Sequence, residues 1–179
     1  ALVEGIQIIS IEDGFAEDDD AGWALLMAEL GDRLFIIGDD LITTNDQTIE
    51  RKTEYTAPYG SKKELLNTAL IKANQIGTLS ETILAMLTSL GKGLELVVSH
   101  RSKSPNDDME AQIALASMAM GLKAGGGANT ERLVKYGAII KLFKDLRQQL
   151  ARQEGKHPEE VSDSRLSEAL ANLVITSIT

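Results

Sequence analysis

The sequence predicts an α/β fold in which about five parallel strands alternate with helices. Short runs rich in β-branched residues recur along the chain, at residues 5–13, 33–40, 69–75, 94–101 and 120–125. Longer stretches of helical pattern lie between them, at residues 20–30, 79–92, 106–120 and 129–150. Strands and helices that alternate in this way form right-handed βαβ units around a parallel sheet.

The composition of the individual runs supports this prediction. In the first run, isoleucines at positions 6, 8, 9 and 11 hardly alternate with polar residues, which is typical of parallel strands covered on both faces. The helical stretch at 106–120 has apolar residues at positions 109, 113, 116 and 120. That spacing of three or four residues is typical of a helix packed on a sheet.

Two stretches of the chain depart from the alternation. Residues 46–63 begin as a helix and continue as an irregular loop that contains Pro58 and Gly60. After Gln153, the residues Gly155 and Pro158 interrupt the long helical pattern, and a shorter amphipathic helix follows at 159–174. We therefore expect a partial barrel over residues 1–153 and a helical C-terminal extension of the same domain over residues 154–179.

The composition limits what the protein can do. The chain has 179 residues, of which 43% are hydrophobic and 25% charged, enough for one packed domain. Its formal net charge of −9 argues against binding to nucleic acid or to anionic membranes, so an anionic substrate needs a local cluster of cations. The absence of cysteine excludes disulfides and thiolate metal sites. No apolar run approaches the roughly 18 residues of a membrane span, which predicts a soluble protein. The absence of cysteine fits a reducing cytosol, so we expect a cytoplasmic protein.

Polar or charged residues follow every predicted strand. In order, they are Glu12 and Asp13; Asp39 and Asp40; Lys72; His100, Arg101 and Ser102; and Lys123. Any one of them could merely solvate a loop. In a parallel barrel, however, the carboxyl ends of all strands meet on one face, where active sites are built. Five such ends in succession, with complementary charges, favour a functional site.

Five segments of the chain resemble the enolase (phosphopyruvate hydratase) family, in the family's order. They are SIEDGFAEDD (10–19), GDDLITTN (38–45), LIKANQIGTLSET (70–82), VVSHRS (97–102) and LKAGGGANTERLVKY (122–136). The resemblance extends from residue 10 to about residue 150. It implies the C-terminal portion of an enolase-type TIM barrel, and the magnesium-dependent dehydration of 2-phosphoglycerate to phosphoenolpyruvate in glycolysis.

The resemblance also implies roles for the acidic residues and the lysines. Glu12 and Asp39 match the magnesium ligands of the family, whereas Asp13 and Asp40 would be neighbours of the site. Lys72 matches the general base that removes the proton from carbon 2. Lys123 matches the lysine beside the substrate carboxylate. A surface salt bridge is the alternative for both lysines.

The remaining implied roles concern the phosphate. His100, Arg101 and Ser102 match a loop that closes over the substrate phosphate, where an arginine can make a bidentate contact. A histidine alone would more often be a packed or solvent-facing residue.

The implied reaction requires cations next to a base. A proton beside a carboxylate is very weakly acidic, so cations must stabilise the doubly charged ene-diolate that forms when it leaves. The enolase superfamily is the known example of a lysine combined with magnesium for this purpose. Magnesium and Lys123 near Lys72 would also favour the unprotonated amine that a base needs.

The chain departs from the family at several places. Gly14 replaces a proline, residues 103–107 read KSPND in place of GETED, and residues 122–125 read LKAG in place of IKTG. The stretch between Asn45 and Leu70 is longer than in the family, and is interpreted either as a surface insertion or as a lid over the substrate. Complete enolases also have an N-terminal domain and earlier barrel strands, which supply a third magnesium carboxylate and the general acid.

These departures lead to further expectations. We expect weak magnesium binding, little dehydratase activity of the 179 residues alone, and association with a second copy or with a complementing N-terminal part of the same protein. A truncated barrel that acts as a non-catalytic binding or scaffold module is the alternative. A third possibility is another proton-abstracting member of the superfamily, against which the SHRS run and the paired lysines argue.

Overall fold

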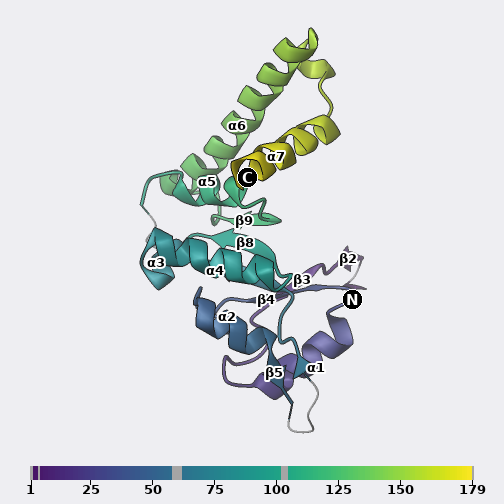
Figure 1. The fold of residues 1–179 in the computed structure, drawn as a ribbon, viewed down its shortest axis with the longest axis vertical. Helices are drawn as coiled ribbons and strands as arrows, with labels where there is room; N and C mark the ends of the chain where they lie inside the picture. Colours follow the sequence, from purple (N-terminus) through teal and green to yellow (C-terminus); the bar gives the residue numbers. More distant parts are fainter. Residues whose placement is uncertain (1, 4, 58–61, 102–104, 179) are drawn as a thin grey trace. The chain divides into compact units, whose positions relative to one another are not determined.

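The computed structural model describes residues 2–3, 5–57, 62–101 and 105–178, and its fold is drawn in Figure 1. The chain divides into two compact units, which we call unit 1 (Ala1–Ser102) and unit 2 (Lys103–Thr179). The predicted α/β class is confirmed. Four of the five predicted strands lie in unit 1, as β3, β4, β7 and β8, and the fifth is β9 in unit 2.

Unit 1 is built on a parallel sheet. Its strands are β3 (Ser10–Glu12), β4 (Phe35–Gly38), β7 (Thr68–Ile71) and β8 (Glu95–Ser99), hydrogen-bonded in that order. The register places Glu12 beside Ile37, Ile37 beside Thr68, and Leu70 beside Val97. Because all four strands are parallel, their carboxyl ends share one edge of the sheet.

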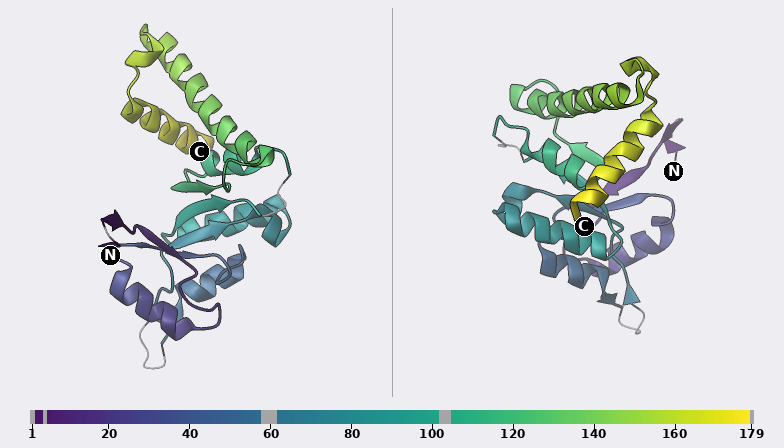
Figure 2. Two further views of the ribbon diagram at one scale, coloured as in Figure 1. Left: turned by 180° about the vertical axis from the view of Figure 1, so that it is seen from behind. Right: turned by 45° about the horizontal axis from the view of Figure 1, so that its top comes forward.

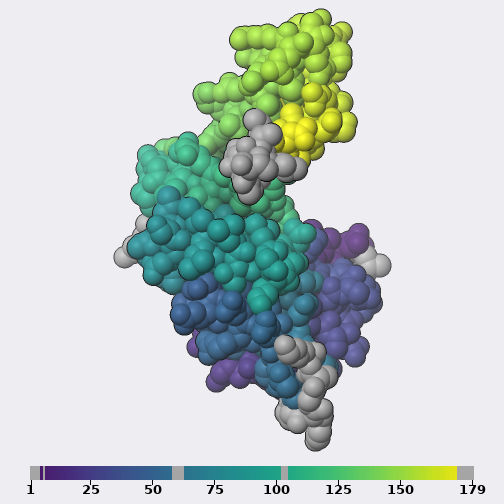
Figure 3. Space-filling view, viewed as in Figure 1, coloured from purple at the N-terminus to yellow at the C-terminus, as the bar shows by residue number. Residues whose placement is uncertain are grey.

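Four helices accompany this sheet: α1 (Asp20–Leu30), α2 (Asp46–Thr53), α3 (Ala73–Ile76) and α4 (Leu79–Gly91). Side chains cap three of them, since Asp19, Asn45 and Thr78 each accept a hydrogen bond from a backbone N–H in the first turn. Helix α1 has the predicted bounds, and α4 ends one residue before the predicted position. Helix α4 forms part of the surface of unit 1 (Figure 3). Its Leu87 side chain is 59% exposed.

Two of the predicted strands are shorter in the structure. Of residues 5–13, only Ser10–Glu12 join the parallel sheet, because β1 (Leu2–Val3) and β2 (Ile6–Gln7) form an antiparallel pair around Gly5, whose φ is 87°. Strand β7 ends at Ile71 rather than at residue 75, because the chain turns into helix α3 directly after Lys72. The end of β7 agrees with the expectation that Lys72 follows this strand, and Lys72 lies where the strand meets helix α3.

The stretch between Asn45 and Leu70 contains helix α2 and a second antiparallel pair. Strands β5 (Tyr55–Thr56) and β6 (Lys62–Lys63) pair after α2 has returned from the carboxyl edge of the sheet. The N–H of Leu65 then donates to the carbonyl of Lys52 at 3.1 Å, just before β7 begins. Strands β5 and β6 therefore lie toward the amino ends of the parallel strands, which favours the surface-insertion interpretation. Pro58 and Gly60 lie outside the described residues.

Unit 2 contains α5 (Met109–Ala116), β9 (Gly121–Lys123), α6 (Thr130–Glu154), the short helix η1 (Pro158–Glu160) and α7 (Asp163–Ile178). Helix α6 ends where Gly155 adopts a φ of 64°, and η1 and α7 then return along it (Figures 1 and 2). The pair is held by one apolar cluster, Leu146, Leu150, Ala151, Val161 and Leu166.

Helix α5 is shorter than predicted, because Met118 adopts a positive φ of 54° and breaks the helical pattern. The boundary expected between residues 153 and 154 stays a prediction. In the described part of the chain, none of the helices combines the length and the apolar character needed to cross a bilayer.

Candidate metal and substrate site

The site lies at the carboxyl edge of the sheet of unit 1, above a layer of apolar side chains. Ile37 of β4, Leu70 of β7 and Val97 of β8 are buried together in this layer. Side chains on a strand alternate between the two faces, so the residues two positions further along point the same way. For β4 and β7 these residues are Asp39 and Lys72.

Asp39 and Lys72 form an ion pair. Asp39 is only 6% exposed, and one of its oxygens, Oδ2, accepts a hydrogen bond from Nζ of Lys72. The other oxygen, Oδ1, is buried and accepts no hydrogen bond from any residue that the structure describes. A buried carboxylate oxygen without a donor is costly, which indicates a place for a further cation.

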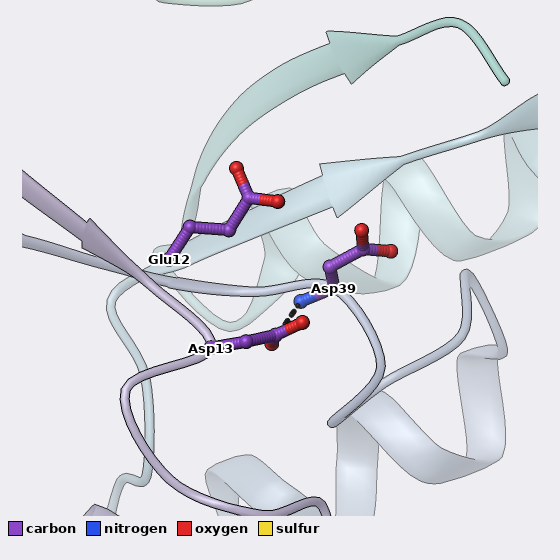
Figure 4. Close-up of side chains that lie close together, drawn as sticks. All are labelled: Glu12, Asp13 and Asp39. Carbon is purple, nitrogen blue, oxygen red and sulfur yellow. Dashed lines mark hydrogen bonds between the residues drawn. The ribbon is translucent and has the colours of Figure 1, made fainter. Parts of the chain in front are cut away.

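Glu12 contributes a second carboxylate. It ends β3 opposite Ile37, so alternation places it on the same face as Asp39. Figure 4 shows that the two carboxylates extend in the same direction from neighbouring strands. One oxygen each of Glu12, Asp13 and Asp39 lies within 4.8 Å of the others. Hard carboxylate oxygens at this spacing fit magnesium.

Asp13 has a different position. Its Oδ1 accepts the backbone N–H of Asp39 at 2.9 Å and its Oδ2 accepts that of Asp40 at 3.1 Å, so the carboxylate turns toward the backbone of the next strand (Figure 4). Asp13 also adopts a positive φ of 45°, which aspartate tolerates better than most residues. This geometry fits the predicted role of a neighbour that supports the site.

Thr44 also contacts the site, and sequence reasoning missed it. Its side chain is fully buried in the loop between β4 and α2, and its hydroxyl oxygen accepts the backbone N–H of Lys72 at 2.9 Å. The two residues are 28 positions apart. No local pattern in the sequence indicates such a contact, although Thr44 lies within the GDDLITTN segment.

The predicted phosphate-binding residues follow β8. His100 is partly buried, and Arg101 is exposed and donates to the carbonyl of Asn74 at 3.4 Å, just inside α3. Arg101 therefore lies on the same edge of unit 1 as Lys72. Ser102 lies outside the described residues. Lys123 is exposed at the end of β9 in unit 2, and its proximity to Lys72 stays a prediction.

A protein-family model for "Enolase, C-terminal TIM barrel domain" matches residues 1–161 of the chain. The chain belongs to the enolase family. Enolases use magnesium, and the cluster formed by Glu12, Asp13 and Asp39 is a possible site for it. The family match includes both the sheet of unit 1 and strand β9 with helix α6 of unit 2, so every candidate site residue lies within the enolase domain.

Proposed function

We propose that this enolase domain serves the magnesium-dependent dehydration of 2-phosphoglycerate to phosphoenolpyruvate. The observation that carries the proposal is the state of Asp39. It is a buried carboxylate that holds a lysine amine on one oxygen and offers the other oxygen, without a donor among the described residues, beside Glu12. A base next to a cation site is what proton removal beside a carboxylate requires.

Glu12 and Asp39 are the proposed magnesium ligands. When bound, the ion would supply positive charge that stabilises the negative charge developing on the substrate carboxylate. Asp13 would keep Asp39 in place through the backbone, since both of its oxygens accept N–H groups of the β4 end. Two protein carboxylates leave several positions of the ion to water and substrate, which is consistent with weak binding of magnesium alone.

Lys72 is the proposed base. Its Nζ would take the proton from carbon 2 of the substrate and keep it beside Oδ2 of Asp39. Its side chain is 15% exposed, so the amine is held at the edge of the sheet and still reachable from outside. This partial exposure fits a group that must meet a small substrate.

The other cations would bind the substrate. Arg101, with His100 and Ser102, would bind the phosphate, and Lys123 would face the carboxylate. A guanidinium presents paired N–H groups that match two phosphate oxygens. Because the chain as a whole is acidic, these cations would give an anionic substrate a favourable local field.

The proposal is tested by exchange of the carbon-2 proton. With magnesium in deuterium oxide, proton NMR should show loss of the carbon-2 signal of 2-phosphoglycerate when the protein is added. Absorbance of phosphoenolpyruvate in the ultraviolet follows the complete reaction, for which we expect little turnover by these 179 residues alone. A protein that binds magnesium and substrate but exchanges no proton would instead be a binding module.

The ligand assignment has its own test. Calorimetry should show that Glu12→Gln combined with Asp39→Asn abolishes magnesium binding. The matched control is Glu17→Gln with Asp18→Asn, which removes the same charge from exposed residues a few positions away and should leave binding unchanged. Tight binding that survives the first pair of substitutions would rule out Glu12 and Asp39 as ligands.

A further inference from the structure

We propose that Thr44 is a positioning residue that holds Lys72 in place for proton transfer. This inference rests on the proposed function, because it assumes that Lys72 is the base. Thr44 would not touch the substrate. It would act by fixing the backbone from which the lysine side chain extends.

The contacts of Thr44 join two elements. Its hydroxyl oxygen accepts the N–H of Lys72 at 2.9 Å, and its hydroxyl proton is donated to Oε1 of Gln75 at 3.1 Å. Lys72 precedes helix α3 and Gln75 lies in its first turn. The hydroxyl of Thr44 therefore accepts the N–H of Lys72 at the point where the strand β7 ends. The same hydroxyl also contacts the first turn of α3, the helix that follows.

The backbone of the loop is strained around this contact. Thr43 and Thr44 have φ values of 50° and 55°, in the left-handed region. Two consecutive β-branched residues in this region are exceptional, because Cβ branching makes it sterically unfavourable. Such strain persists only where surrounding contacts stabilise it, and it is concentrated at functional sites.

The same loop begins at the proposed metal ligand. The carbonyl of Asp39 accepts the N–H of Thr43 at 2.8 Å, and on the other side Asn45 caps α2 through Thr48 at 2.9 Å. Residues 39–45 thus form one fixed turn with Asp39 at its start and Thr44 near its end. Through this turn, Thr44 would set the separation between the proposed base and the proposed metal ligand.

Position 43 provides a matched control for position 44. The hydroxyl of Thr43 donates to the adjacent carbonyl of Ile42, at 2.8 Å, rather than to another element, and the residue is exposed. Thr43→Val and Thr44→Val both keep a β-branched side chain in the left-handed region, so both keep the backbone strain. They differ in whether the N–H of Lys72 loses its acceptor. Thr44→Ser keeps the hydroxyl and should rescue the effect.

The first measurement is independent of catalysis. Brief treatment of the intact chain with acetic anhydride, followed by mass spectrometry, gives the acetylation of Lys72 relative to the exposed Lys144. Thr44→Val should raise this ratio about threefold or more, because local opening exposes the amine. Thr44→Ser and Thr43→Val should stay within about twofold of the unsubstituted protein.

The second measurement is carbon-2 proton exchange at saturating substrate and magnesium. Thr44→Val should lower the maximal exchange rate roughly tenfold with little change in the half-saturating substrate concentration, since displaced catalytic groups lose rate more than binding. Magnesium binding should not change. If Thr44→Val does not fold, Thr44→Ala removes the hydroxyl with less bulk and serves in its place.

The possible outcomes distinguish the positioning role of Thr44 from the proposed role of Lys72 as the base. Unchanged acetylation of Lys72 in Thr44→Val, or equal effects of Thr43→Val and Thr44→Val, would overturn the positioning role. Increased acetylation in Thr44→Val, together with no exchange by the unsubstituted protein, would support the positioning role and contradict the proposed base. Increased acetylation with normal exchange would show that the position of Lys72 does not limit proton transfer, and would also overturn the inference.

Discussion

Two lysine–carboxylate pairs in this chain differ in the exposure of the lysine and in the groups that surround the pair. In unit 2, Lys135 is 0% exposed, donates to the carbonyls of Pro105 and Asp107 at 3.1 and 2.8 Å, and lies 3.1 Å from Oε2 of Glu110. Two carbonyls and a carboxylate surround its ammonium group. In unit 1, the Lys72 side chain is 15% exposed, and Glu12 offers a carboxylate oxygen within 4.8 Å of one of Asp39. Both pairs leave one buried carboxylate oxygen without a hydrogen-bond donor among the described residues, Oδ1 of Asp39 and Oε2 of Glu110.

The difference shows how to distinguish a structural pair from a candidate site. Lys135 connects helix α6 to the segment before α5. Its buried ammonium group contacts two carbonyls and a carboxylate of unit 2. Lys72 keeps partial exposure, and its partner Asp39 lies beside a second carboxylate, Glu12, with which it could hold a further cation. The residue types are alike in the two pairs. The partial exposure of the lysine and the second carboxylate beside Asp39, rather than the presence of a buried ion pair, therefore point to function.

Replacing Lys72 should give the largest effect. Lys72→Met should lower carbon-2 proton exchange by about 10²–10⁴-fold, because the general base is lost. Magnesium binding should persist, since the amine does not coordinate the ion. Proton NMR measures the exchange, and Lys92→Met, which removes a lysine paired with Glu54, is the matched control. Normal exchange by the Lys72 variant would place the base elsewhere.

Replacing Lys135 should affect stability instead. Lys135→Met should lower the free energy of unfolding of unit 2 by about 3–5 kcal/mol, because it leaves Glu110 charged and buried without a partner. Urea titration followed by far-ultraviolet circular dichroism measures the loss. Lys141→Met, at an exposed pair with Asp145, should cost only about 0.5 kcal/mol.

A second substitution sharpens this prediction. Adding Glu110→Leu to Lys135→Met should restore much of the stability, because removing both charges leaves no buried ion without a partner. Equal losses for the single and the double variant would show that the contacts of Lys135 with the carbonyls of Pro105 and Asp107, rather than the ion pair, stabilise unit 2.

Asp13 should have an intermediate effect on the site. Asp13→Asn replaces one accepting oxygen by an NH₂ group, so the N–H of Asp39 or that of Asp40 loses its acceptor. Magnesium affinity should therefore fall roughly tenfold, as it does when other residues that orient metal ligands are replaced. Calorimetry measures the affinity. Asp40→Asn removes an adjacent charge but keeps the backbone N–H, and should change affinity by no more than about twofold. Equal losses in both variants would indicate that charge alone matters.

The smallest expected effect concerns a partly exposed cluster in unit 2. Hydrogen bonds from Lys156 and then Arg165 hold the pKa of Glu154 below its ordinary value of 4.5. The ion pairs therefore stabilise unit 2 above about pH 4.5, and that contribution is lost as the pH falls through the lowered pKa. Carbon NMR titration should show a rise in the pKa in Lys156→Gln, a smaller rise in Arg165→Gln, and none in Lys144→Gln.

The sequence predicts which helices and strands form better than it predicts the residues at which they begin and end. Helix α1 was predicted to the residue, because Asp19 and Gly31 mark its limits. The run 69–75 extends past the end of β7 at Ile71, where the chain turns into α3 and Thr44 from a distant loop accepts the N–H of Lys72. Helix α5 is shorter than the predicted 106–120, and the positive φ of Met118 after its end has no signature in the apolar spacing of that stretch.

The family resemblance predicts the residues of the candidate site one by one. It does not predict the contacts that hold those residues in place. The structure brings Glu12, Asp39 and Lys72 to one edge of unit 1, as their positions after the strands predicted. The backbone contacts of Asp13 and Thr44 span 26 to 28 residues, and both residues adopt left-handed backbone, which is unfavourable for the β-branched Thr44. Local patterns carry no information about such contacts.

Trp23, the only tryptophan of the chain, gives the site a built-in optical probe. It is fully buried in α1, and its indole N–H donates to the carbonyl of Ala16 at 2.9 Å, in the loop that follows Glu12 and Asp13. Indole emission responds to the strength of this hydrogen bond and to the polarity around the ring. Any rearrangement of residues 13–19 on cation binding would therefore shift the wavelength of the tryptophan emission. Stopped-flow fluorescence of the unlabelled protein could follow that shift in real time.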